Sequence, residues 1–183
     1  MGICNLSPDS FSGDGLGSDI EATVTQAKRM VAGGVDIIDV GGESARPGTA
    51  PESINDIDDE LQLVIPAIER LAAELPVPIS IDTYKSGVAH HALKAGASMI
   101  NDIWGLKKDP VLAELAAEAG VPIILMSNQR DTPSEDIMPA VISDLERGIS
   151  VALRAGVPEA DIIVDPGVGF GKSLKQNLEI ISR

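Results

Sequence analysis

Aromatic residues are almost absent from this sequence. Its 183 residues include one Trp, one Tyr and two Phe, although 44% of the chain is hydrophobic. Any hydrophobic core must therefore be built from aliphatic side chains. At about 150 residues per domain, the length fits one domain, and no long linker or low-complexity run divides the chain. We therefore expect a single domain over residues 1–183 with an aliphatic core.

Basic residues are scarce as well. Lys and Arg together number 14 against 28 Asp and Glu, which gives a formal net charge of −14. Binding to nucleic acid or to an anionic membrane surface requires clustered Lys and Arg, so neither is expected as the main partner. The excess of acid is typical of a well-solvated protein surface.

Disulfides and long apolar runs are also missing. The single cysteine, Cys4, cannot form an internal disulfide, which is typical of a reducing compartment. No stretch approaches the ~20 apolar residues of a membrane span. The N-terminus lacks the basic segment and apolar core of a signal peptide. The sequence therefore predicts a soluble protein of the cytoplasm.

Short apolar segments alternate with helical patterns along the chain. Segments rich in Ile and Val predict buried strands at 2–6, 36–40, 78–81, 98–103, 122–126 and 161–164. Apolar residues at helical spacing predict a helix from about 20 to 32, with Ser18 and Glu21 as a capping box and Gly33 at its end. Further helices are expected near 57–71, 85–94, 110–119 and 138–155, and from Ser173 onward with Gln176 as its capping partner. This alternation predicts an α/β fold with parallel strands and helical crossovers.

Polar residues stand at the ends of the predicted strands: Asn5, Asp39, Asp82, Asn101, Asp102 and Asp165. A closed parallel barrel brings the carboxyl ends of all its strands to one mouth, where the active sites of that fold lie. An open doubly wound sheet brings together only the ends beside a switch point. We therefore favour a TIM-type (β/α)8 barrel, of which about six βα units are present.

Asp82 and Asp165 each end a strongly apolar strand. Burying a carboxylate costs several kcal/mol unless it is paired or hydrogen-bonded, so each requires a partner. Together with the amide of Asn101, the two carboxylates form a suitable receptor for a flat heterocycle with several N–H donors. A metal site and simple helix capping are the alternatives.

The glycine-rich segment 165–173 fits neither nucleotide-binding template. Pro166 stands where a P-loop requires glycine, and Lys172 stands where the dinucleotide motif requires it. The segment predicts a strand-to-helix turn whose amides and Lys172 attract an anion, or whose glycines serve the turn alone. Segments 7–18 and 41–53 are typical of active-site loops. In the second of them, Arg46 is suited to an anionic substrate group or to pairing with a nearby acid.

Five segments, in order along the whole chain, resemble the motifs of dihydropteroate synthase. They are MGICNLSPDSFS (1–12), IIDVGGESARPG (37–48), ISIDT (79–83), INDI (100–103) and DPGVGFGK (165–172). The resemblance implies a (β/α)8 barrel that condenses 6-hydroxymethyl-7,8-dihydropterin pyrophosphate with 4-aminobenzoate, releasing pyrophosphate, in folate biosynthesis. It implies a transferase with small-molecule substrates, and the family also commonly forms a homodimer.

The resemblance also implies roles for individual residues. The pterin would be bound by Asp82, Asn101, Met126, Asp165 and Phe170. The two loops would bind 4-aminobenzoate through Phe11, Ala45, Arg46 and Pro47, and Asn5 would bind the Mg²⁺ that accompanies pyrophosphate. Catalytic roles would fall to Arg46, Asp82 and Lys172. In the implied mechanism, metal and cations draw off pyrophosphate, and the amine attacks the exposed pterin methylene cation.

Several family features are absent from these residues. Ala45 stands where Thr is common, Ser127 replaces a usual His, and Gly13-Asp14-Gly15 shifts a loop carboxylate by one position. The Ser-Arg-Lys and Arg-x-His motifs of the family's seventh and eighth strands do not occur, so the barrel is expected to be incomplete at the C-terminus and to lack the usual lead-in before Met1. We therefore expect pterin binding with weak or absent turnover from the 183 residues alone. The alternatives are a non-catalytic pterin-binding homologue, a methyltetrahydrofolate-binding domain of a methyltransferase, and an inactive fragment.

Overall fold

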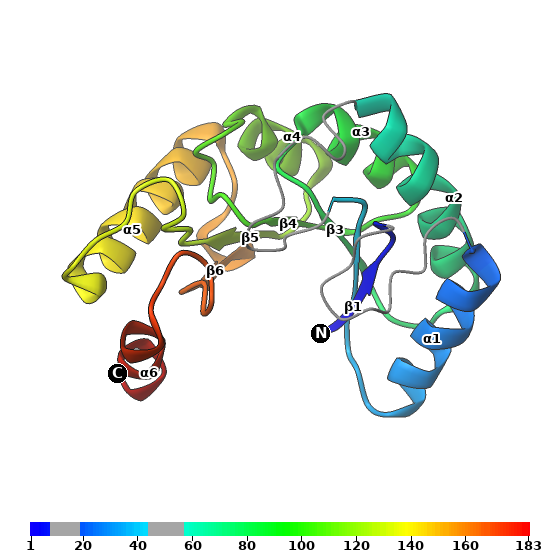
Figure 1. The fold of residues 1–183 in the computed structure, drawn as a ribbon. Helices are drawn as coiled ribbons and strands as arrows, with labels where there is room; N and C mark the ends of the chain where they lie inside the picture. Colours follow the sequence, from blue (N-terminus) through cyan, green and yellow to red (C-terminus); the bar gives the residue numbers. More distant parts are fainter. Residues whose placement is uncertain (8–18, 44–56) are drawn as a thin grey trace. The chain divides into compact units, whose positions relative to one another are not determined.

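The computed structural model describes residues 1–7, 19–43 and 57–183 (Figure 1). In these ranges strands and helices alternate in the order β1 (Gly2–Asn5), α1 (Ile20–Ala32), β2 (Ile38–Gly41), α2 (Ile57–Glu74), β3 (Ile79–Asp82), α3 (Ser86–Ala95), β4 (Met99–Asp102), α4 (Val111–Ala119), β5 (Ile123–Met126), α5 (Ile137–Ala155), β6 (Ile162–Asp165) and α6 (Leu174–Ser182). A short 3-10 helix, η1 (Glu159–Asp161), precedes β6. Each strand and helix predicted from the sequence coincides with an observed one, so the α/β class is confirmed.

The chain forms two compact units, Met1–Asn101 and Asp102–Arg183. In the first, four strands pair in parallel in chain order, β1-β2-β3-β4. Helix α2 packs against both α1 and α3 beside these strands (Figure 1). In the second, β5 and β6 are parallel neighbours, and α5 packs on both of them and on α4. In both units, parallel neighbours are joined through helices, which is the connection that such pairing requires.

The core is aliphatic in both units, as the composition predicted. In the first unit, strand residues such as Val40, Ile81 and Ile100 are completely buried, together with Ile68 and Leu71 of α2. The second unit buries Leu112, Ala113, Ile123, Leu125 and Ala152 in the same way. Among the described residues, the largest completely buried side chains are all Leu and Ile apart from Glu60. Burial of aliphatic surface stabilises the fold by about 25 cal/mol per Å².

The helix ends follow local capping chemistry, with one correction to the sequence prediction. Helix α1 is capped by Asp19, whose Oδ1 accepts a hydrogen bond from Ala22 N at 2.9 Å, and the predicted cap Ser18 lies outside the described residues. Serine and aspartate cap about equally well, so the sequence pattern cannot separate adjacent candidates. The capping box predicted for Ser173 and Gln176 at the start of α6 is confirmed. In the described part of the chain, no helix has both the length and the apolar character required to cross a membrane.

Candidate active site

One row of residues crosses the carboxyl ends of the first four strands. Asn5 of β1 is opposite Gly41 of β2, which is opposite Asp82 of β3, which in turn is opposite Asn101 of β4. Side chains at one level of adjacent parallel strands face the same side of the sheet. The first unit therefore places three of the predicted site residues, Asn5, Asp82 and Asn101, in one line, and each is half-buried.

Gly41 leaves space for a carboxylate in this row. A Cβ at this position would lie 3.4 Å from both Cβ and Oδ2 of Asp82. A bulky side chain here would therefore cover the carboxylate from its β2 side. The glycine keeps Asp82 approachable.

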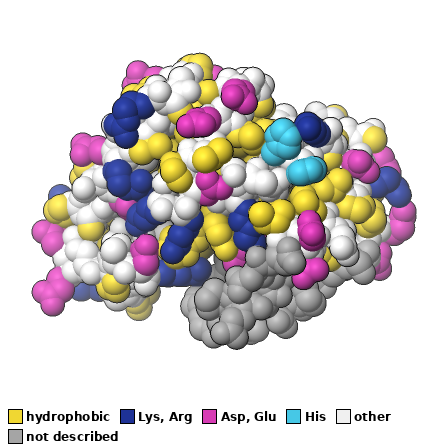
Figure 2. Space-filling view, turned by 90° about the horizontal axis from the view of Figure 1, so that it is seen from above, with side chains coloured by type: hydrophobic (Ala, Val, Ile, Leu, Met, Phe, Trp, Pro, Cys, Tyr) yellow, Lys and Arg dark blue, Asp and Glu magenta, His cyan; other side chains and the backbone are white. Residues whose placement is uncertain are grey.

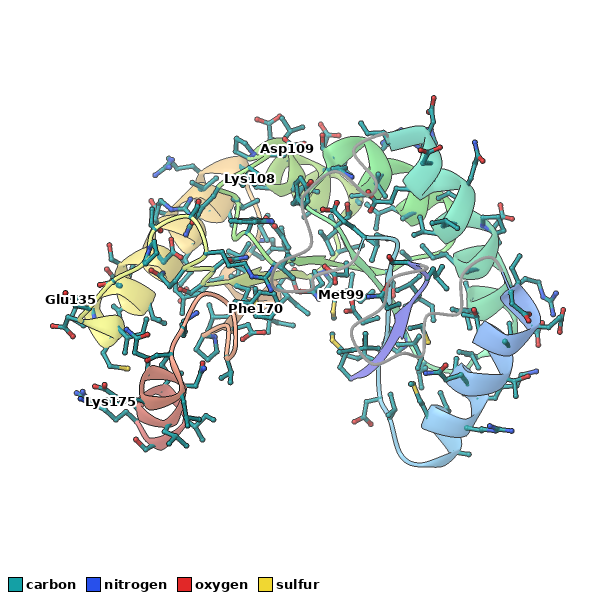
Figure 3. The ribbon with its side chains drawn as sticks, in the orientation of Figure 1. Met99, Lys108, Asp109, Glu135, Phe170 and Lys175 are labelled. Atoms are coloured by element: carbon teal, nitrogen blue, oxygen red, sulfur yellow. The ribbon has the colours of Figure 1, made fainter. Side chains whose placement is uncertain are left out.

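A second layer lies two residues deeper in the same strands. Asp39 of β2 is opposite Ser80 of β3, and Ser80 is opposite Met99 of β4, which is labelled in Figure 3. Asp39 Oδ2 accepts a hydrogen bond from Asn101 Nδ2 at 3.1 Å. Burial raises the pKa of Asp39 to about 6, and hydrogen bonding by Ser80 and Asn101 opposes that rise. Sequence reasoning noted Asp39 as a strand-end carboxylate but gave it no role.

Asn5 offers one neutral oxygen to a metal ion. Its Oδ1 accepts a hydrogen bond from Ser7 N at 2.9 Å, which fixes the orientation of the amide. Protein-bound Mg²⁺ usually keeps several waters and takes one or two protein oxygens together with substrate phosphates. A single amide oxygen fits an ion held mainly by pyrophosphate. No cluster of three His, Cys, Asp or Glu suited to a metal occurs among the described residues.

The second unit carries the remaining predicted pterin residues. Met126 of β5 is opposite Asp165 of β6 at the carboxyl ends of the two strands. Asp165 Oδ1 accepts a hydrogen bond from Gly167 N at 2.7 Å, so this carboxylate holds the start of the loop between β6 and α6. Gly167 has a φ of +69°, a conformation that glycine adopts without strain. Phe170 lies on the same loop and is labelled in Figure 3.

Lys172 closes that loop. Its Nζ donates to three backbone carbonyl oxygens, those of Ser127 and Gly167 at 2.8 Å each and of Phe170 at 3.2 Å. An ammonium group has three N–H donors, so this set uses all of them. Burial lowers the pKa of Lys172 to about 8. In this structure the lysine shapes the loop, whereas the sequence had suggested it as an anion-attracting cation.

Two further residues of the second unit make contacts near this loop or the end of β5 that were not predicted from the sequence. The guanidinium of Arg130 lies over the ring of Phe170, with 4.5 Å from Cζ to the ring centroid. Asp144 of α5 accepts a hydrogen bond from Ser127 Oγ at 3.1 Å and forms an ion pair with Lys107 at 2.8 Å. No local sequence motif predicts these contacts, because each joins residues that are distant in sequence.

The predicted loop residues Phe11, Ala45, Arg46 and Pro47 lie outside the described residues. Beside the start of the second loop, Lys85 Nζ lies 3.1 Å from Glu43 Oε2 and 2.8 Å from Glu60 Oε2. The side chain of Glu60 is 1% exposed, and burial raises its pKa, against the effect of Lys85. His90 and His91 lie exposed on α3, coloured cyan in Figure 2.

Comparison with known proteins identifies the class of protein to which this chain belongs. The family described as "Pterin binding enzyme" matches residues 1–183. The dihydropteroate synthase of Bacillus subtilis is 49% identical over 183 residues, and that of Streptococcus pyogenes serotype M3 is 43% identical over 183 residues. The match covers all of this chain in both cases, but 63% of the first relative and 68% of the second.

Solved structures agree with the sequence comparison. A dihydropteroate synthase from Clostridium difficile, solved in the presence of pteroic acid, superimposes with a TM-score of 0.89 at 45% identity, covering all of this chain and 69% of that one. A Xanthomonas albilineans dihydropteroate synthase with 4-aminobenzoic acid also gives a TM-score of 0.89, at 39% identity, covering all of this chain and 66% of that one. The chain therefore belongs to the pterin-binding enzymes and, among them, to the dihydropteroate synthase family. Its fold is part of the (β/α)8 barrel of that family, as predicted.

Proposed function

We propose that this chain forms the pterin-binding part of a dihydropteroate synthase. The proposed reaction joins 6-hydroxymethyl-7,8-dihydropterin pyrophosphate to 4-aminobenzoate and releases pyrophosphate. The observation that carries the proposal is the row from Asn5 to Asn101 at the strand ends, in a chain 49% identical over its whole length to a dihydropteroate synthase. A methyltransferase domain has no comparable support among these relatives.

The pterin contacts proposed for the first unit are Asp82 and Asn101, and those proposed for the second are Met126, Asp165 and Phe170. The carboxylates accept hydrogen bonds from ring N–H groups, and charge-assisted bonds of this kind are about twice as strong as neutral ones. Phe170 offers an aromatic face and Met126 a thioether to the flat ring. Each unit thus provides an acceptor for ring N–H donors, and the second unit adds apolar surface for a ring face.

The carboxylates also favour the reaction electrostatically. When the bond between the pterin methylene carbon and oxygen breaks, the electron pair leaves with pyrophosphate and positive charge develops on the pterin. Carboxylates fixed beside the ring stabilise that charge without reorganisation. The amine nitrogen then forms the new C–N bond and loses its proton to solvent. We propose Arg46, Phe11, Ala45 and Pro47 as the 4-aminobenzoate loop residues and Lys172 as the residue that holds the pterin loop in shape.

Magnesium is the proposed cofactor, with Asn5 as its single protein ligand. When bound, the ion would neutralise part of the pyrophosphate charge. Asn5 supplies the oxygen and, through its bond with Ser7 N, a fixed orientation for it. We also infer a cytoplasmic location, because Cys4 is an unpaired, buried thiol. A homodimer stays a prediction that light scattering of the purified chain can test.

The test separates binding from turnover. We expect the purified chain to bind pteroic acid in isothermal titration calorimetry, and formation of dihydropteroate in the presence of Mg²⁺ is assayed separately. The Bacillus subtilis enzyme serves as the active control. Absence of binding by a chain with native circular dichroism would overturn the proposal.

A further inference from the structure

Asp39 is too deeply buried to touch a ligand directly. Its side chain belongs to the layer below the row of Asn5, Asp82 and Asn101, and the residue is 3% exposed. Its Oδ2 accepts from Asn101 Nδ2, and the hydroxyl of Ser80, opposite Asp39 on β3, is a second polar neighbour of the carboxyl. Burial of a carboxylate is costly even with such partners, so its retention requires a reason beyond packing.

The contact between Asp39 and Asn101 passes over an intervening strand. Asp39 is on β2 and Asn101 is on β4, with Ser80 of β3 between them at the level of Asp39. Adjacent strands are about 4.8 Å apart, so two short side chains can meet across β3 only where its own side chain is small. Ser80, which is completely buried, meets that requirement.

The direction of the hydrogen bond follows from the charge of Asp39. Burial raises its pKa to about 6, so at neutral pH the carboxyl is mostly ionised and accepts without donating. Asn101 must therefore present its NH₂ group to Asp39. The two ends of an amide group point apart, so its Oδ1 stays available as an acceptor on the other side.

We propose that Asp39 is a positioning residue that fixes the amide of Asn101 so that its Oδ1 accepts an N–H of the pterin. This inference rests on the proposed function of Asn101 and Asp82 as pterin contacts. With the amide fixed, the two proposed pterin contacts of the row, Asp82 and Asn101, both offer oxygen atoms to the ligand. A reversed amide would present N–H donors to the N–H donors of the ring.

The size of the expected loss in pterin affinity follows from the conformational freedom that the Asn101 side chain would regain without Asp39. Ordering one mobile side chain on binding costs about 0.5–1.5 kcal/mol. Removal of Asp39 should therefore weaken pterin binding by about 2- to 13-fold through Asn101. Asp39→Asn keeps an oxygen that can accept from Asn101, so its affinity should lie clearly closer to that of the parent than the affinity of Asp39→Ala does.

A double-mutant cycle on the purified chain tests the mechanism, with pteroic acid as the probe in calorimetry. Asp39→Ala should weaken binding in the parent but not in the Asn101→Ala background, and Asp39→Asn should restore it. Ser80→Ala, a change in the same buried layer that leaves the contact between Asp39 and Asn101 in place, is the comparison variant and should cost less affinity than Asp39→Ala. Equal losses from Asp39→Ala in both backgrounds would show that Asp39 acts by stabilising the fold and would overturn the inference.

A second readout needs no ligand. In the free chain, the side-chain amide resonances of Asn101, assigned by their loss in Asn101→Ala, should show one proton shifted downfield and protected from exchange. Asp39→Ala should abolish that protection, and Ser80→Ala should not. If the parent chain failed to bind pteroic acid, the proposed function and this inference would both fall. If it bound while the Asn101 amide showed no dependence on Asp39, only the inference would fall.

Discussion

The substitution Asp165→Asn separates two roles of the Asp165 carboxylate, which are holding the loop after β6 and, as proposed, binding the pterin. In the structure Asp165 Oδ1 accepts from Gly167 N at 2.7 Å and thereby holds the loop that carries Phe170. An asparagine can place its own Oδ1 there and keep the loop. The second carboxylate oxygen then becomes an NH₂ group, which cannot accept an N–H of the pterin.

The expected loss of affinity follows from that exchange. A hydrogen bond to a charged group contributes about 1.5–3 kcal/mol, which corresponds to roughly a 10- to 150-fold change in Kd. The donor left opposite the ring N–H adds an unsatisfied group to this loss. We therefore expect Asp165→Asn to reduce pteroic acid binding by at least about 10-fold, and to abolish it at ordinary protein concentrations.

Calorimetry with pteroic acid measures this loss, and thermal unfolding followed by circular dichroism checks the fold. Asp161→Asn, the same chemical change at the opposite end of the β6 segment, is the matched control and should bind like the parent. Asp165→Ala should lose both affinity and the tie to Gly167. Unchanged affinity in Asp165→Asn would refute the assignment of Asp165 to the pterin.

Two further predictions concern buried carboxyl groups. Lys85→Met leaves the Glu60 carboxylate buried without its ion-pair partner 2.8 Å away. This should lower the unfolding free energy, measured in urea, by about 3–5 kcal/mol, and the added change Glu60→Gln should recover much of the loss. A loss below about 1 kcal/mol would contradict the reasoning. Burial raises the pKa of Asp102 from 3.8 to about 6, so its contribution to stability is complete below about pH 4 and is lost as pH rises through about 6. The unfolding free energy of Asp102→Asn relative to the parent should therefore rise by up to about 3 kcal/mol from pH 4 to pH 7, and a difference independent of pH would count against this account.

The order and kind of the elements could be predicted because each strand has a strong local signal. The Ile and Val runs are short and bounded by turn residues, and the helices between them carry apolar residues at helical spacing. Helices α3, α4 and α5 end at glycines in the left-handed conformation, Gly96, Gly120 and Gly156, which is a local preference readable from the chain. The predicted N-cap of α1 was wrong by one residue, since Ser18 and Asp19 are both residue types that cap helices well.

The alignment of the site residues was less accessible to sequence reasoning. Strand-end positions suggested that Asp82 and Asn101 lie near each other, but their direct opposition depends on strand register, which is set by packing of the whole sheet. The contact from Asn101 to Asp39 skips one strand, and no spacing rule predicts it. Lys172 meets three carbonyl oxygens because of the path of the loop, which its sequence motif does not specify.

Among the described residues, three buried carboxyls share one arrangement that links stability to the site. Asp39 is bound by the amide of Asn101, Glu60 by the ammonium of Lys85, and Asp102 by the backbone N–H groups of Trp104 and Leu106. Burial raises the pKa of each of them, so each is a net burden on the folded state at neutral pH. Each also fixes a donor at or next to the carboxyl end of a strand, where fixed geometry serves binding rather than stability. Asp39→Asn and Asp102→Asn should therefore stabilise the chain at neutral pH, whereas Glu60→Gln should do so only together with Lys85→Met, because alone it breaks an ion pair. Of the changes at Asp39, only Asp39→Ala, which removes the acceptor from Asn101, should weaken pterin binding.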